Sequence, residues 1–139
     1  MPHVPPTPHR AGLLTLLLAL VSTACSAAPG VEAPGRVAHT VFFWLKADAP
    51  PGTADAMIAF YRTEVAKAPG VVAVAAGVPR PSERDVVDDS FHVGTTVTFA
   101  SNEAEIAWQT EPIHDAMKAR FFAHVERVAV YDTLVTAPE

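Results

Sequence analysis

His114 is the residue of this sequence whose position best suits acid–base chemistry. Pro112 is typical of the first position of a helix, so we expect His114 in the first helical turn. The positive end of the helix dipole there disfavours the charged imidazolium. A neutral imidazole can accept a proton near neutral pH, which is what a general base must do. The alternative is a histidine that only caps or packs the helix.

Two further histidines, His39 and His92, lie in segments that we expect to form strands. Together with His114 they could supply three imidazoles to zinc or copper. No carboxylate stands at a ligand-like spacing from them in the sequence, and nothing marks an axial ligand for haem. We therefore expect no metal and no cofactor. For both strand histidines, a hydrogen bond across the sheet is the competing interpretation.

The segment 37–46 must position the first of these histidines. It is rich in β-branched and aromatic residues and is too short for a typical helix, so it is predicted to be a strand. Its two faces, which alternate along the segment, are both largely apolar. A strand of this kind is expected to be covered on both sides. The faces consist of Val37, His39, Val41, Phe43 and Leu45, and of Ala38, Thr40, Phe42 and Trp44.

The elements that follow alternate between helix and strand. Thr53 is expected to cap a helix that Pro69-Gly70 ends, with apolar residues at helical spacing. Strands are predicted over 71–78 and 91–99, separated by a charged loop over 79–89. In the third strand one face is expected to hold Phe91, Val93, Thr95, Val97 and Phe99.

The C-terminal part supplies two helices and the last strand. Asn102 and Glu105 are expected to form a capping box that opens a short helix to about Gln109. A second helix begins at Pro112, and a final strand is predicted over 125–135. The order β-α-β-β-α-β predicts a ferredoxin-like α+β fold, with an antiparallel sheet and the helices on one face. Since the first strand is apolar on both sides, we expect a homodimer with the two sheets face to face.

Composition excludes several classes of function. The chain has 139 residues, about one domain, with 10 basic and 15 acidic residues and a formal charge of −5. This acidic balance argues against nucleic-acid binding, which needs clustered lysine and arginine. The single cysteine, Cys25, excludes an internal disulfide and cysteine-rich zinc sites.

The N-terminus carries the features of an export signal. Residues 11–24 are apolar or small, follow the single basic residue Arg10, and are too few to span a membrane. We expect residues 1–24 to be a signal peptide and 25–36 to be a flexible tether. The residues before Cys25 resemble a bacterial lipoprotein box, which would make Cys25 the lipidated first residue. Ordinary cleavage, leaving a free thiol in a secreted protein, is the alternative. The chain is thus expected in the cell envelope, with a lipid anchor as its only membrane contact.

Several short motifs, taken together, resemble the Dabb family, the stress-responsive dimeric α/β-barrel domain. The resemblance covers residues 37–135 and rests on Val37-Ala38-His39, Ser90-Phe91-His92, Val97-Thr98-Phe99, Glu111-Pro112-Ile113-His114 and Val130-Tyr131-Asp132. It implies a dimer whose sheets close into a barrel. The family includes a plant polyketide cyclase in which a helix-start histidine is the base, supported by strand histidines and a tyrosine. His114, His39 and His92 match the histidines, and Trp108 stands at the tyrosine position.

The sequence supports two main hypotheses for function, beside a purely structural one. In the first, the dimer binds a small hydrophobic or aromatic molecule, in a stress response, with Trp108, Phe43 and Phe121 in the pocket. In the second, the chain is a cofactor-free enzyme of the cyclase, lyase or oxygenase type with His114 as general base. A purely structural protective role, with neither ligand nor turnover, is the third interpretation.

Overall fold

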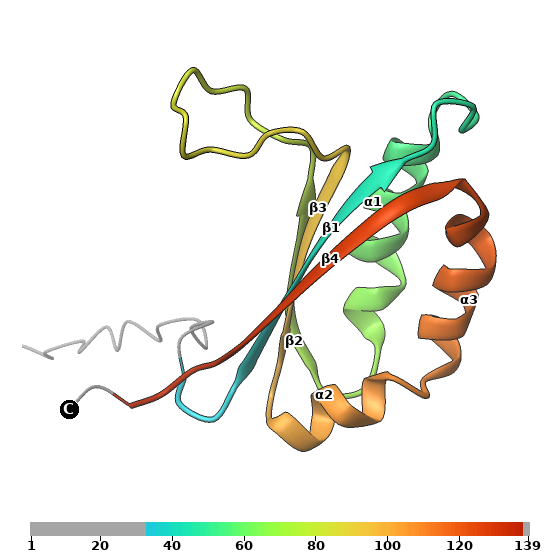
Figure 1. Ribbon diagram of the computed structural model, residues 1–139. Coiled ribbons are helices and arrows are strands. Elements are labelled where there is room, and N and C mark those ends of the chain that lie inside the picture. Colours follow the sequence, from blue (N-terminus) through green and yellow to red (C-terminus); the bar gives the residue numbers. More distant parts are fainter. Residues whose placement is uncertain (1–32, 138–139) are drawn as a thin grey trace, which may run out of the picture.

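The computed structural model describes residues 33–137, and these form a ferredoxin-like α+β domain (Figure 1). The four strands pair in the order β2-β3-β1-β4, with every neighbouring pair antiparallel, and the helices lie on one face of the sheet. The fold class predicted from the sequence is confirmed. The elements, in order, are β1 (Val37–Leu45), α1 (Thr53–Thr63), the 3-10 turn η1 (Val65–Lys67), β2 (Val71–Gly77), β3 (Val93–Phe99), α2 (Asn102–Trp108), α3 (Pro112–Phe121), the 3-10 turn η2 (Phe122–His124) and β4 (Val125–Leu134).

The predicted signal peptide, Cys25 and most of the predicted tether lie outside the described residues. Within residues 33–137, the helices are too short and too polar to cross a membrane.

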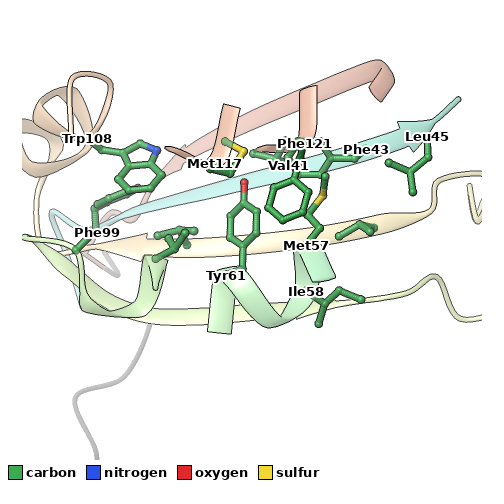
Figure 2. Packing of buried hydrophobic residues seen from close by; sticks show 14 of the residues in the cluster. Val41, Phe43, Leu45, Met57, Ile58, Tyr61, Phe99, Trp108, Met117 and Phe121 are labelled. Carbon is green, nitrogen blue, oxygen red and sulfur yellow. The ribbon is translucent and has the colours of Figure 1, made fainter. Parts of the chain in front are cut away.

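The core fills the space between the sheet and the helices (Figure 2). Alternate residues of β1, among them Val41 and Phe43, point into it, as do Met57 and Tyr61 from α1. A strand turns successive side chains to opposite faces, whereas a helix buries one stripe, and both periods are visible here. Trp108 closes the core at the end of α2 and contacts Phe99 at 5.9 Å between ring centroids.

The opposite face of the sheet carries its own aromatic group, which we call the outer aromatic face: Phe42, Trp44, Phe91, Arg127 and Tyr131. Phe42 lies 4.7 Å from Phe91 between ring centroids, and the Arg127 guanidinium stands 3.6 Å over Trp44. The prediction that Phe91 shares a face with Val93 was wrong. Phe91 precedes β3, where the strand alternation does not yet hold, and it packs against the outer side of β1.

Two predicted helix caps were also wrong by one residue. Gly52, at φ +82°, is the N-cap of α1, and the Thr53 hydroxyl instead donates to the Pro50 carbonyl at 2.7 Å. Ser101, not Asn102, caps α2, and its hydroxyl accepts a hydrogen bond from the Ala104 amide. Glycine, serine and asparagine are all good N-caps, so the residue types alone could not decide between neighbours. Helix α1 also stops at Thr63, before Pro69-Gly70, because the chain tightens into η1.

Candidate functional site

A pocket of about 300 Å³ lies between the helix-facing side of the sheet and the helices α2 and α3. Most of its lining residues are apolar or aromatic, and four polar side chains converge on it, those of His39, Gln109, His114 and Asp132. On β4, Val128 and Val130 are 37% and 49% exposed, so the pocket opens along this edge strand. The lining residues are His39, Val41, Phe43, Tyr61, Trp108, Gln109, His114, Met117, Phe122, Val128, Val130 and Asp132.

His39 and Asp132 form the polar pair on the floor of the pocket. They are directly opposite each other in the β1–β4 register, and His39 Nδ1 lies 2.6 Å from Asp132 Oδ1. Because an ionised carboxylate can only accept, His39 Nδ1 carries the proton of this bond. In the neutral ring this leaves Nε2 as an acceptor. The strand pairing therefore fixes both the orientation and the tautomer of His39.

His114 lies on the opposite wall, in the first turn of α3 as predicted. Its Nδ1 lies 3.3 Å from the Gln109 carbonyl oxygen, and its ring packs on Trp108 at 4.8 Å between centroids. A carbonyl only accepts, so Nδ1 donates and Nε2 is again the free acceptor. Burial is the main cause that lowers the pKa of His114, and Lys118 adds to it. The neutral imidazole expected from the helix dipole is thus favoured chiefly by burial.

The structure brings some of the predicted site residues together and leaves others apart. His39, His114, Trp108 and Phe43 line the pocket. His92 does not, because its Nδ1 accepts a hydrogen bond from the Leu45 amide at 3.1 Å, beyond the end of the pocket wall. Phe121 is buried in the core, 5.7 Å from Phe60 between ring centroids, and is not part of the lining. The predicted lipidation residue, Cys25, is outside the described part of the chain.

Four polar residues of the site were not predicted as such: Tyr61, Gln109, Asp132 and Glu105. Tyr61 lies on the buried face of α1 and lines the pocket, and burial raises the pKa of its phenol. Asp132 could have been found from the register, since it lies on the helix-facing side of β4 opposite His39.

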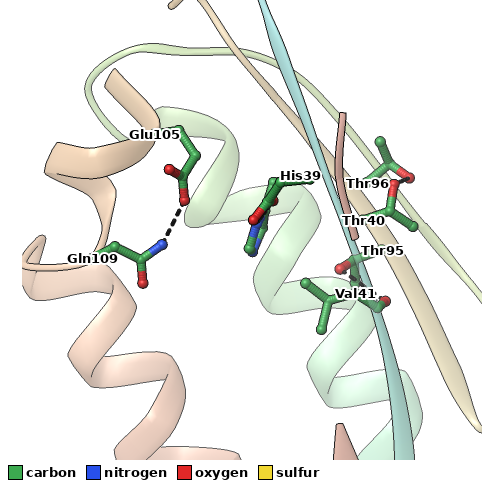
Figure 3. A network of polar contacts seen from close by, with 8 residues as sticks. His39, Thr40, Val41, Thr95, Thr96, Glu105 and Gln109 are labelled. Atoms are coloured by element: carbon green, nitrogen blue, oxygen red, sulfur yellow. Dashed lines mark hydrogen bonds and ion pairs between the residues drawn. The ribbon is translucent and has the colours of Figure 1, made fainter. Parts of the chain in front are cut away.

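Glu105 was assigned to a capping box and instead lies beside the pocket. Its carboxylate accepts a hydrogen bond from Gln109 Nε2 at 2.7 Å, on the side of α2 that faces His39 (Figure 3). One ligand-type atom each of His39, Glu105 and Asp132 lies within 4.8 Å of the others. The sequence spacing had shown no carboxylate near the histidines, and the tertiary structure brings two to His39.

The family is shown by a sequence match over the whole domain. The sequence profile of the Dabb family, described as the stress responsive A/B barrel domain, matches residues 37–135. The chain belongs to the Dabb family. The match spans every strand and helix described above, including both walls of the pocket. No curated protein sequence matches this Dabb chain significantly.

Solved structures resemble this Dabb chain at low sequence identity, which shows a shared fold. A hydroxynitrile lyase from Passiflora edulis has a TM-score of 0.65 and 21% identity, covering 77% of this chain and 99% of its own. A Dabb protein with a ferredoxin-like fold from Mesorhizobium loti has a TM-score of 0.58 and 23% identity, covering 71% and 95%. A dimeric ferredoxin-like protein of unknown function from Thermobifida fusca has a TM-score of 0.60 and 14% identity, covering 73% and 92%.

Proposed function

We propose that this Dabb domain binds a small hydrophobic or aromatic molecule in the pocket between the sheet and α2–α3. The observation that carries this proposal is the combination of apolar walls with His39–Asp132 and His114 as polar groups. The apolar walls would bind the body of the ligand, and the two free Nε2 atoms would accept hydrogen bonds from a donor group on it. The family description supports a role in a stress response.

Trp108 provides the readout for this proposal. The chain has two tryptophans, and in a Trp44→Phe background the pocket residue Trp108 is the only one. Titration with 4-hydroxyacetophenone, an aromatic ketone whose phenolic hydroxyl can donate a hydrogen bond, is expected to quench Trp108 emission saturably. Val130→Phe, which fills the pocket from the half-exposed edge strand, is expected to abolish saturation. Val86→Phe, at a site 82% exposed in the loop, serves as the matched control. Equal quenching in both variants would count against a ligand in this pocket.

A second candidate function is proton transfer by His114 in a cofactor-free enzyme of the lyase, cyclase or oxygenase type. The favouring observation is that burial holds His114 neutral while the Gln109 carbonyl fixes its tautomer, which presents Nε2 as a base. In a lyase reaction on an aromatic hydroxynitrile, Nε2 would take the hydroxyl proton. The carbon–carbon bond to the nitrile would then break, and cyanide would leave with that proton as hydrogen cyanide.

Release of aldehyde from an aromatic hydroxynitrile tests this second function. His114→Gln is expected to lower kcat at least 100-fold, the usual contribution of a positioned general base. The control is Asp55→Asn, which changes an exposed acidic residue in the first turn of α1, outside the pocket, and should leave kcat unchanged. Full activity in His114→Gln would remove His114 from the mechanism.

We further propose that the chain acts as a homodimer joined through the outer aromatic face. That face exposes Tyr131 to 62% and forms a continuous aromatic cluster on a sheet face that no helix of residues 33–137 covers. Dimeric structural neighbours support this arrangement. Tyr131→Asp is expected to give a monomer in analytical ultracentrifugation. Ile106→Asp, at a similarly exposed apolar site on α2, should remain dimeric. A dimeric Tyr131→Asp protein would place the interface elsewhere.

Export to the cell envelope, with Cys25 lipidated, is proposed from the N-terminal sequence alone. Expression in a bacterial host with radiolabelled palmitate tests it. The intact chain should incorporate label and sediment with membranes, and Cys25→Ser should do neither. A labelled Cys25→Ser protein would exclude Cys25 as the acceptor.

A further inference from the structure

His39, Glu105 and Asp132 form the only group of three metal-ligating side chains found close together within residues 33–137. They come from three elements, β1, α2 and β4, and are separated by 66 and 27 positions along the chain. One nitrogen or oxygen atom of each lies within 4.8 Å of the others. Such convergence from distant segments is a property of the fold, unlike a run of acidic residues along one surface helix.

Each of these side chains is oriented by a neighbouring strand or side chain. The β1–β4 register sets His39 opposite Asp132, and the two already approach to 2.6 Å. The Glu105 carboxylate is oriented by the Gln109 amide at 2.7 Å, as Figure 3 shows. Partners that orient a ligand from outside the coordination sphere are a regular feature of protein metal sites, because they reduce the rearrangement that binding requires.

The donor set favours a borderline divalent cation. One imidazole nitrogen and two carboxylate oxygens suit Zn²⁺ and Mn²⁺, whereas the absence of thiolate or thioether donors disfavours Cu⁺. Metal–ligand distances of about 2.0–2.2 Å place ligand atoms about 3.5 Å apart. Ligand atoms as far as 4.8 Å apart therefore need to close by only about 1 Å, and the His39–Asp132 pair, now at 2.6 Å, needs to open by about as much. The two carboxylates together carry the charge that neutralises a divalent ion.

The pocket lies on the open side of this group. His39 and Asp132 both line it, and its volume of about 300 Å³ leaves room for water or another oxygen donor to complete the coordination. A cation here would stand between the apolar pocket and α2. It would thus tie the edge strand β4 to the helical layer, where the pocket is otherwise open.

We propose that His39, Glu105 and Asp132 bind one divalent transition-metal ion, Zn²⁺ by preference, at the wall of the pocket. This site goes beyond the proposed ligand-binding function and does not depend on it. Binding of the ion displaces the proton between His39 and Asp132, which passes to solvent, and no oxidation or reduction is involved.

The test uses the full chain, freed of metal with a chelator and titrated with ZnCl₂ by calorimetry. Wild-type protein is expected to bind one equivalent tightly and to show a higher Tm with Zn²⁺ than without it. Glu105→Gln should weaken this binding at least tenfold. The matched control is Glu103→Gln, an exposed glutamate in the same helix that lies outside the group and should bind as wild type does.

Other histidines of the chain are unchanged in both variants, so any Zn²⁺ that they bind contributes equally to both titrations. Co²⁺ absorption in the visible range gives a second readout, since removal of a ligand oxygen changes its spectrum. Asp132→Asn should repeat the Glu105→Gln result, and if it fails to fold, Glu105→Gln decides alone. Equal Zn²⁺ affinity in wild type, Glu105→Gln and Glu103→Gln would overturn the proposal, as would a wild-type chain that binds none. The 4-hydroxyacetophenone titration on metal-free protein tests the pocket ligand separately.

Discussion

Gly70 offers the sharpest test of how the pocket is built, because a side chain at this position would collide with α2. Its φ is +77°, and its carbonyl accepts a hydrogen bond from the Ala100 amide at 2.8 Å, just before α2 begins. A Cβ built on Gly70 would stand 2.6 Å from the Cβ of Ala104. Substitution Gly70→Ala therefore combines a strained backbone with a direct collision against the helix that carries Trp108 and Glu105.

The magnitude follows from two separate costs. An alanine held in the left-handed region costs about 1–2 kcal/mol relative to glycine. Carbon atoms pack best at about 3.5–4.0 Å, so a 2.6 Å contact must relax by roughly 1 Å, and overpacking of this kind costs about 1–3 kcal/mol. The free energy of unfolding should fall by about 2–5 kcal/mol in total. For a domain of this size each 1 kcal/mol corresponds to about 4–8 °C in Tm.

Gly35 provides the matched control. Its φ is +83°, and a Cβ there would have no atom within 4 Å, so Gly35→Ala should cost only the backbone part, about 1–2 kcal/mol. A double-mutant cycle then isolates the contact. In an Ala104→Gly background, Gly70→Ala should cost about 1–3 kcal/mol less than in wild type, because the colliding Cβ is gone.

The assay is urea denaturation followed by far-UV circular dichroism, with Trp108 emission in the Trp44→Phe background as a local probe of α2. If Gly70→Ala were no more destabilising than Gly35→Ala, the reasoning from close approach would fail. A coupling of less than about 0.5 kcal/mol in the cycle would have the same meaning.

Three further predictions concern His114, the packing of Trp108 and the N-cap of α2. Because burial lowers the pKa of His114 below its ordinary 6.5, the unfolded chain binds a proton more readily than the folded one. The contribution of His114 to the free energy of unfolding should therefore fall as pH drops from about 6.5 to the lowered pKa, and should stay level above 6.5. In His114→Gln this decrease should be absent from denaturant titrations across the same pH range. Trp108→Ala should cost about 3–5 kcal/mol by thermal unfolding, against less than about 0.5 for Ile106→Ala on the exposed side of α2. Ser101→Ala should cost about 1 kcal/mol and Asn102→Ala clearly less; the reverse order would restore the cap predicted from the sequence.

The fold could be predicted from the sequence because short-range residue patterns indicate each strand and helix. The alternation along residues 37–46 and the helical spacing from Met57 to Val65 are short-range signals, and chain order then restricts the topology to few choices. Caps were harder, because neighbouring residues such as Ser101 and Asn102 have similar capping strength. Only the backbone path decides which hydroxyl or amide meets the first free N–H group.

In the candidate site, too, some positions depend on local sequence and others on tertiary packing. His114 was found from the sequence because its position depends on one local feature, the helix start at Pro112. The partnership of His39 with Asp132, and the approach of Glu105 to both, depends on strand register and on how α2 packs against β1. His92 and Phe121 fall outside the pocket for the same reason: strand ends and helix rotation, set by packing of the whole core, determine where those side chains point. The sequence by itself thus determines the residue types and the local strand and helix patterns. Contacts between distant segments are decided by the tertiary structure, because they form only when the apolar faces of the sheet and the helices pack together into the core.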